Sequence, residues 1–279
     1  MIASGFASAG ANVLLTSRDE KACKEAAESL IAKMANANHP YKPAPAIHYI
    51  ASNVSSREGC KALALYANQV FGGKLDVLVN NAGTSWGEDP YDTDRESGRV
   101  NWGWDRVMDL NVKGLFYLSR ECVPMLQRQR QQSQGGKGAS ASASASASAS
   151  ASEDPGRIIN IGSIAGMITQ EAPTHAYDVS KAAVHHLSKK MAADLAPKGI
   201  TVNVIAPGYV PSRMSKGLAA YGADDEKIVS SIPLGRMGGE DDMAGAAIFL
   251  SSKAGAWTTG VILNVDGGAC TLQMPLSSL

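Results

Sequence analysis

Residues 75–83 read Leu-Asp-Val-Leu-Val-Asn-Asn-Ala-Gly, an apolar strand pattern that runs directly into two amides and a glycine. Such a turn places polar groups at the carboxyl end of a parallel strand, the edge of an open α/β sheet where ligands bind. Two later strand patterns end in the same way, one in Pro207-Gly208 and the last in Asp266-Gly267-Gly268. An Asn-Gly turn can also be plain punctuation, so the prediction depends on the rest of the chain.

Strand and helix patterns alternate along the sequence. We predict strands over 12–17, 47–51, 75–80, 157–161, 201–206 and 261–265, and helices over 1–9, 20–35, 57–71, 104–130, 176–195 and 241–250. This alternation predicts βαβ units with right-handed crossovers. The fold class is therefore α/β, with a doubly wound parallel sheet in a single domain over 1–279.

Composition excludes several classes of partner. The 279 residues carry 26 Lys and Arg against 26 Asp and Glu, with no basic run, which argues against nucleic acid as a partner. No apolar run approaches the ~20 residues of a membrane span, which argues against membrane insertion. The four cysteines (Cys23, Cys60, Cys122 and Cys270) have no metal-ligand spacing, which predicts free thiols in a reducing compartment and no metal site.

Tyr177 and Lys181 stand four residues apart in an Ala-rich helical stretch, with Ser163 upstream. Residues i and i+4 share a helix face, so the phenol and the ammonium can enter one pocket. A cation beside a phenol, whose ordinary pKa is ~10, favours the phenolate and helps the group to exchange a proton near neutral pH. With a serine hydroxyl to hold a carbonyl oxygen, the trio predicts an acid/base site. A Tyr-x-x-x-Lys pair can also be an accident of a solvated helix face.

Asn111 interrupts an apolar helical stretch. A buried asparagine in mid-helix must find hydrogen-bond partners or cost ~1–3 kcal/mol, so packing alone does not explain it.

A low-complexity segment lies at about 131–154 and includes an Ala-Ser repeat from Gly138 to Ser152. Its composition cannot form a packed core, and it falls between a predicted helix and a predicted strand. We predict a disordered surface insertion.

Taken together, these motifs resemble the short-chain dehydrogenase/reductase family, from Met1 to about Gly268. The resemblance implies a Rossmann-like fold and a catalytic tetrad of Asn111, Ser163, Tyr177 and Lys181. Tyr177 would donate a proton to the substrate oxygen as hydride arrives from a nicotinamide, and Ser163 would hold that oxygen. Lys181 would lower the pKa of Tyr177 and bind the nicotinamide ribose, while Asn111 would anchor a proton-relaying water.

The second family strand ends in Ser17-Arg18, the point at which such enzymes choose their cofactor. An arginine there complements a 2′-phosphate, which predicts NADP(H), although Asp19 follows directly and Arg18 could be a solvated charge. Asn53-Val54 stands where the family commonly has Asp-Val near the adenine. The further cofactor contacts implied by the resemblance are Asn81, Ala82, Gly83, Tyr177, Lys181, Pro207, Gly208, Val210 and Ser212.

A finer resemblance, to the 3-oxoacyl reductase branch, rests on residues 80–87, 211–214 and 232–236. It implies reduction of a 3-oxoacyl thioester, with residues 209–235 as a substrate lid hinged at Gly217 and Gly222. Trp86 would line the acyl pocket or simply pack. Two alternatives stay open: a reductase or dehydrogenase for a polyol, steroid or quinone, and a truncated, non-catalytic relative that binds no nucleotide.

The remaining tryptophans and histidines have no assigned role in the chemistry. Trp102 and Trp104 are interpreted as anchors of the following helix. His175, His185 and His186 show no triad or metal pattern and are interpreted as loop and helix residues.

The family's first strand and Gly-rich turn, which normally precede the segment beginning at Met1, are absent. In the family's strand order the lost strand lies between the strands that end at Ser17 and Asn80, whose facing edges would be unpaired. A buried central strand contributes on the order of 10 kcal/mol, comparable to the ~5–15 kcal/mol stability of a domain. We therefore expect a marginal chain and a longer biological protein. A cytoplasmic homo-oligomer is implied by resemblance, and organelle targeting stays open.

Overall fold

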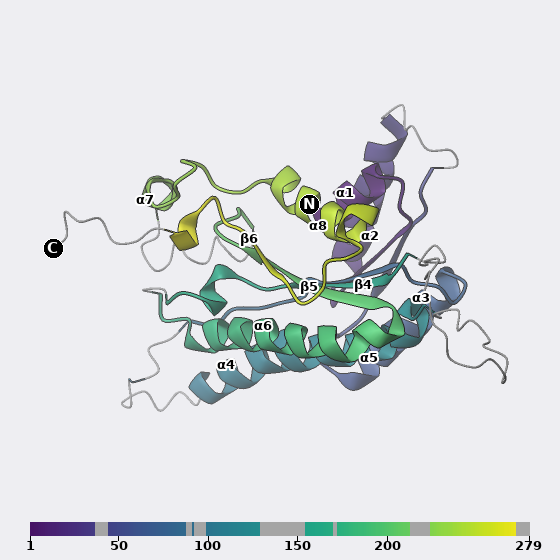
Figure 1. Cartoon of the computed structure of the whole chain (residues 1–279), viewed down its shortest axis with the longest axis horizontal. Helices are drawn as coiled ribbons and strands as arrows, with labels where there is room; N and C mark the ends of the chain where they lie inside the picture. The colour runs from purple at the N-terminus through teal and green to yellow at the C-terminus, as the bar shows by residue number, and fades with distance from the viewer. Residues whose placement is uncertain are drawn as a thin grey trace, which may run out of the picture.

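The computed structural model describes residues 1–36, 44–87, 91, 99–128, 154–169, 172–212 and 224–271. Parallel strands form a central layer between two groups of helices (Figure 1). One face carries α1 (Ile2–Ser8), α2 (Glu20–Asn36) and α8 (Glu240–Ser251). The other carries α3 (Arg57–Val70), α4 (Arg99–Met108), α5 (Leu115–Leu126) and α6 (His175–Leu195). The predicted α/β fold class is confirmed.

The strands fall into two hydrogen-bonded sheets. β1 (Val13–Ser17) pairs with β2 (Ile47–Ala51), and a second sheet has the order β3 (Val77–Asn80), β4 (Gly156–Ile161), β5 (Ile200–Pro207) and β6 (Ile262–Val265). All pairs are parallel, in the registers Val13 to Ile47, Val77 to Arg157, Gly156 to Ile200 and Val204 to Ile262. Within the described residues no strand joins β1 to β3, which agrees with the expected unpaired edges.

Two apolar cores cover the two faces of the second sheet. The larger lies among α3, α5 and α6 and includes Leu118, Leu126 and Val184. The smaller lies beneath α1 and α8 and includes Ile159 and Leu250. Leu14 of β1 and Ile50 of β2 pack against the larger core, so apolar burial rather than strand pairing attaches the first sheet to the second.

The helix predicted over 104–130 differs from the observed structure. It begins at Arg99, contains a π-helical segment η1 (Asp109–Gly114) and ends at Leu126, two residues after Pro124. A π-turn inserts an extra residue into the helical ladder and is frequent at functional sites. Gly114 permits the local packing, because a Cβ on it would lie 2.2 Å from the Val54 carbonyl oxygen.

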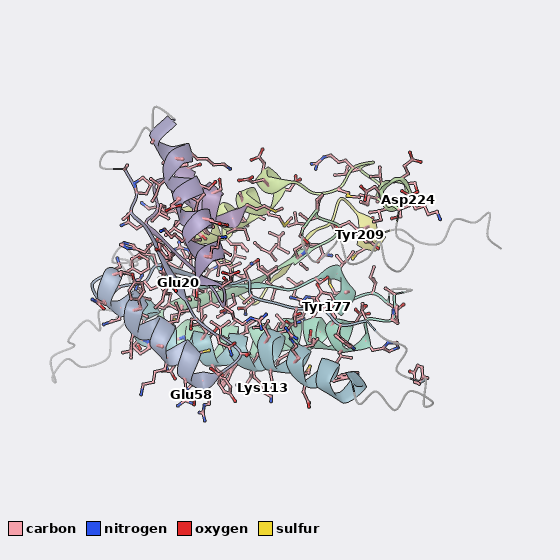
Figure 2. All side chains as sticks on the ribbon, turned by 180° about the vertical axis from the view of Figure 1, so that it is seen from behind. Glu20, Glu58, Lys113, Tyr177, Tyr209 and Asp224 are labelled. Carbon is pink, nitrogen blue, oxygen red and sulfur yellow. The ribbon has the colours of Figure 1, made fainter. Side chains whose placement is uncertain are left out.

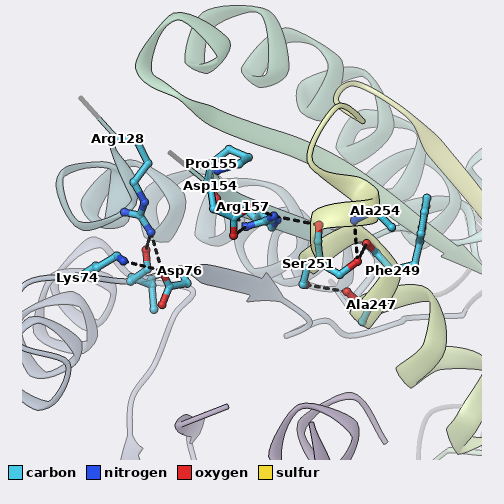
Figure 3. A network of polar contacts seen from close by, with 12 residues as sticks. Lys74, Asp76, Arg128, Asp154, Pro155, Arg157, Ala247, Phe249, Ser251 and Ala254 are labelled. Carbon is cyan, nitrogen blue, oxygen red and sulfur yellow. Dashed lines mark hydrogen bonds and ion pairs between the residues drawn. The ribbon is translucent and has the colours of Figure 1, made fainter. Parts of the chain in front are cut away.

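The predicted insertion at 131–154 falls almost wholly outside the described residues, but both flanks are anchored at the amino-terminal edge of the sheet (Figure 3). Arg128 donates to Asp76 Oδ1 at 2.8 Å and to the Leu75 carbonyl at 2.9 Å. At the end of the predicted insertion, Asp154 is fixed rather than disordered, because the buried Arg157 guanidinium donates to both of its carboxylate oxygens at 2.9 and 2.6 Å. These contacts hold the flanks independently of the Ala-Ser repeat.

Other features of the described residues bear on function. None of their helices is long and apolar enough to cross a membrane, and none of their His, Cys, Asp and Glu side chains form a metal-binding cluster. A short helix that was not predicted, α7 (Asp225–Ser230), lies within the 209–235 segment. The proposed hinges Gly217 and Gly222 lie outside the described residues.

Candidate active site

Helix α6 carries two of the predicted catalytic side chains. Tyr177 and Lys181 are one turn apart near its amino terminus, and the Lys181 ammonium lies 5.5 Å from the Tyr177 ring centroid. Ser163 comes from the turn after β4, where its hydroxyl caps the short helix η2 (Ile164–Gly166) by accepting the Ala165 N–H at 3.2 Å. The Ser163 side chain lies close enough to the Tyr177 hydroxyl to lower its pKa, so the structure brings the predicted trio together.

Lys181 is buried beside the end of β4. Its ammonium donates to the Ile161 carbonyl at 2.8 Å, and only 6% of the residue is exposed. Burial lowers the pKa of Lys181 to about 8, because removal from water penalises the charged form. The Ile161 carbonyl thus holds the Lys181 ammonium at the carboxyl end of β4.

The pKa of Tyr177 is raised, whereas the sequence interpretation expected the lysine to lower it. Burial is the main cause, the hydrogen bond from Ser163 acts in the opposite direction, and the Asp178 charge adds to the increase. The Lys181 ammonium instead donates to the Ile161 carbonyl, at 5.5 Å from the centroid of the Tyr177 ring. Tyr177 is therefore protonated at neutral pH, the state that a proton donor requires.

Asn111 lies in η1 and is 2% exposed. Its Oδ1 accepts the Thr84 N–H at 2.9 Å, and its Nδ2 donates to the Thr84 carbonyl and to Ser180 Oγ, both at 2.9 Å. Ser180 Oγ in turn donates to the Tyr177 carbonyl at 2.7 Å. Asn111 thus joins the turn after β3 to α6 and satisfies the requirement that the sequence imposed.

An open cavity of about 250 Å³ lies at the carboxyl ends of β1 and β2. Its lining comprises Arg18, Asn53, Ser55, Asp105, Arg106, Asp109 and Leu110. This volume is below the ~300–1,000 Å³ of a complete drug-sized ligand site, so the cavity suits one end of a dinucleotide. Arg18 and Arg106 supply two guanidinium groups that match a phosphate.

The carboxylate of Asp19 takes part in the turn that begins α2. Its Oδ1 accepts the Ala22 N–H at 3.1 Å, so the carboxylate caps α2. Ser17 forms part of the same turn, since its hydroxyl donates to the Asp19 carbonyl at 3.0 Å. The neighbouring acidic residue therefore has a structural role, and the arrangement fits NADP(H).

The other predicted cofactor residues lie at the carboxyl edge of the strands, except that the side chain of Val54 points into the core. Asn81 and Ala82 are exposed, and Gly83 lies beside two of the catalytic candidates, because a Cβ on it would come 3.4 Å from Asn111 Oδ1 and 3.7 Å from Lys181 Nζ. Val54 instead buries its side chain in the larger core and does not line the cavity.

The remaining contacts predicted from the resemblance follow β5. Pro207 ends that strand, and the Gly208 N–H donates to the Val265 carbonyl at 3.0 Å. The next turn is held by the Gly238 N–H, which donates to the Tyr209 carbonyl at 2.9 Å, and carries Val210 and Ser212. Figure 2 shows Tyr209 and Tyr177 at the same end of the molecule, so this turn lies at the end that carries the site.

The family model for short chain dehydrogenases matches residues 1–221. The chain belongs to the short-chain dehydrogenase family. It is 40% identical over 268 residues to the rhamnolipids biosynthesis 3-oxoacyl-(acyl-carrier-protein) reductase of Pseudomonas aeruginosa, covering 96% of this chain and 90% of that protein. It is 32% identical to galactitol 2-dehydrogenase (L-tagatose-forming) of Cereibacter sphaeroides, over 96% of this chain and 88% of that one.

Solved structures agree with the family assignment. The NADP active-site complex of Pseudomonas aeruginosa RhlG superposes with a TM-score of 0.76 at 38% identity, covering 96% of this chain and 90% of that one. A gluconate 5-dehydrogenase from Burkholderia cenocepacia, solved with NADP and tartrate, gives a TM-score of 0.73 at 26% identity, covering 98% and 90%. As a member of this family, the chain is an oxidoreductase acting on carbonyl or CH–OH groups.

Sequence reasoning missed several residues that build the site. Thr84 and Ser180 partner Asn111, and Arg106 lines the cavity. His185 is buried on α6 behind Ser163, although the sequence interpretation treated it as an ordinary helix residue. Its spacing was a usable signal, because residues 177, 181 and 185 repeat every four positions on one helix face.

Proposed function

We propose that this protein is an NADPH-dependent carbonyl reductase that converts the 3-oxo group of an acyl thioester to a 3-hydroxy group. The observation that carries the proposal is the meeting of Ser163, Tyr177 and Lys181 at the carboxyl edge of the sheet, with a phenol that burial keeps protonated. The 40% identity to a 3-oxoacyl reductase supports the substrate class.

The chemistry divides between the cofactor and the protein. When bound, the reduced nicotinamide supplies a hydride. Tyr177 donates its proton to the carbonyl oxygen as the C=O π bond breaks, and Ser163 holds that oxygen by a hydrogen bond. Lys181 would bind the ribose beside Gly83. Arg18 would hold the 2′-phosphate, with Asn53 beside it in the same cavity.

A substrate panel tests this proposal. Purified protein is mixed with NADPH and 3-oxoacyl thioesters of several chain lengths, and consumption of reduced nicotinamide is followed by its absorbance. We expect thioesters to give the highest kcat/KM. A second candidate is a polyol dehydrogenase, which the similarity to galactitol 2-dehydrogenase favours. Preference for a sugar ketone, with oxidation of the polyol in the reverse direction, would support it.

The division of the strands into two sheets favours a third candidate, a relative that does not bind nucleotide. Titration with NADPH, monitored by nicotinamide fluorescence, separates this candidate from both enzymes. Saturable binding would exclude it, while absence of binding by the 279-residue chain would support it.

A further inference from the structure

His185 lies directly behind the catalytic serine. It is 5% exposed and sits on α6 two turns after Tyr177 and one turn after Lys181. Its Nε2 accepts the backbone N–H of Ser163 at 3.5 Å. The imidazole therefore contacts the residue that is expected to hold the substrate oxygen, but from the protein interior.

Two glycines show how closely the ring fits against the Ser163 turn. A Cβ on Gly162 would lie 2.4 Å from His185 Nε2 and 2.8 Å from its Cδ2, and a Cβ on Gly166 would lie 2.9 Å from its Cε1. Real Cβ atoms essentially never approach so closely. The ring thus occupies space that both glycines leave free, one on each side of Ser163.

The helix holds the end of β4 at two successive points. Lys181 Nζ donates to the Ile161 carbonyl, and His185 Nε2 accepts the Ser163 N–H two residues later. The acceptor role requires a neutral imidazole with its proton on Nδ1. Burial and the nearby Lys181 and Lys189 charges keep His185 neutral by lowering its pKa to about 4.

We propose that His185 is a positioning residue, which uses its neutral Nε2 and its fit between Gly162 and Gly166 to fix the Ser163 hydroxyl relative to Tyr177. The two hydroxyls come from different elements, the turn after β4 and α6, so their separation depends on how these elements are joined. A displacement of about 1 Å in a catalytic group can cost about 100-fold in rate. This inference rests on the proposed reductase function.

The test compares three substitutions at one position. Leucine removes the acceptor, glutamine can place an oxygen near the position of Nε2, and asparagine places one near Nδ1. We expect His185→Leu and His185→Asn to lower kcat about 10-fold or more, with the Kd for NADPH changed less than about twofold, and His185→Gln to recover most of kcat. His186→Leu, on the exposed neighbour, is the matched control and should leave kcat unchanged.

A second measurement does not depend on turnover. Hydrogen exchange of the Ser163 amide, followed by NMR, should accelerate in the leucine and asparagine variants and return towards the wild-type rate with glutamine. An inactive wild-type protein would refute the proposed function while this measurement still tested His185. The positioning role would be overturned if His185→Leu changed neither kcat nor the exchange rate of the Ser163 amide. It would also be overturned if His185→Leu lost thermal stability while the folded enzyme kept its kcat. If the leucine variant does not fold, the glutamine and asparagine pair decides, and equal behaviour of the two would refute the proposal.

Discussion

Replacement of Asn111 by leucine tests the hydrogen-bond scheme that joins the turn after β3 to α6. Leucine has the same number and branching of side-chain heavy atoms, so the change removes polar partners without opening a cavity. Three hydrogen bonds are lost: one from the Thr84 N–H, one to the Thr84 carbonyl and one to Ser180 Oγ. The orientation of the amide is unambiguous, because a backbone N–H can only donate and a carbonyl can only accept.

The expected loss of stability follows from these partners. Each backbone group of Thr84 left unpaired costs ~1–3 kcal/mol if it is fully buried. Thr84 is half-buried, so water can satisfy part of this demand, and we expect a total loss of about 2–4 kcal/mol. That is a large share of the ~5–15 kcal/mol typical of a folded domain.

Urea denaturation at neutral pH measures the change in the free energy of unfolding. The matched control is Asn68→Leu, the same substitution on the exposed face of α3, for which we expect a change within about 0.5 kcal/mol. A double-mutant cycle with Ser180→Ala should give a coupling of about 1 kcal/mol. A loss below about 1 kcal/mol for Asn111→Leu, or strict additivity with Ser180→Ala, would show that the described network does not support the site.

Four further outcomes are expected. Tyr177→Phe should abolish carbonyl reduction while the Kd for NADPH, measured by fluorescence titration, changes less than about twofold; substantial residual turnover would remove the residue from the acid role. Arg18→Ala should raise the KM for NADPH about 10-fold or more and leave the KM for NADH nearly unchanged, and equal effects on both would contradict 2′-phosphate binding. The pKa of His185 is about 4 in the folded protein and 6.5 as a free group, so the unfolded chain binds the proton first as the pH falls. The contribution of neutral His185 to the free energy of unfolding is therefore complete above about pH 6.5 and decreases towards pH 4, by up to about 3 kcal/mol. In urea denaturation, the stability of His185→Gln should depend less on pH over this range than that of the wild type. Deletion of residues 131–152 should leave the thermal midpoint and kcat close to wild type, whereas Arg157→Met should lower the midpoint by several degrees.

The sequence was sufficient to predict the order of strands and helices because burial patterns reveal them locally. The strand before Asn80 and the continuous apolar run before Pro207 both occur as expected. The π-helical segment at Asp109–Gly114 was not predictable, since its apolar pattern is that of an ordinary helix. What distinguishes it is a tertiary contact, the close approach of Gly114 to the Val54 carbonyl.

The membership of the site was also readable, but its electrostatics were not. The i, i+4 spacing of Tyr177 and Lys181 predicts that they lie close together, and Ser163 follows a strand end that must lie near them. The pKa of Tyr177 depends on the burial of its hydroxyl and on where the Lys181 ammonium points, and neither follows from spacing. Spacing identified which groups meet, and packing determined which protonation state each adopts.

The division of the sheet separates two parts of the site that the cofactor would have to span. Arg18 and Asn53 follow β1 and β2, whereas Ser163, Tyr177 and Lys181 belong to β4 and α6 of the other sheet. No strand pairing within the described residues joins the two sheets, so their relative position rests on apolar packing. A dinucleotide that contacts both would add to that attachment, and by mass action its binding energy would then stabilise the folded chain. The proposed acid/base residues all lie at one sheet, while Arg18, the proposed contact to the 2′-phosphate, lies at the other, so we expect that carbonyl reduction and nucleotide selectivity can fail separately.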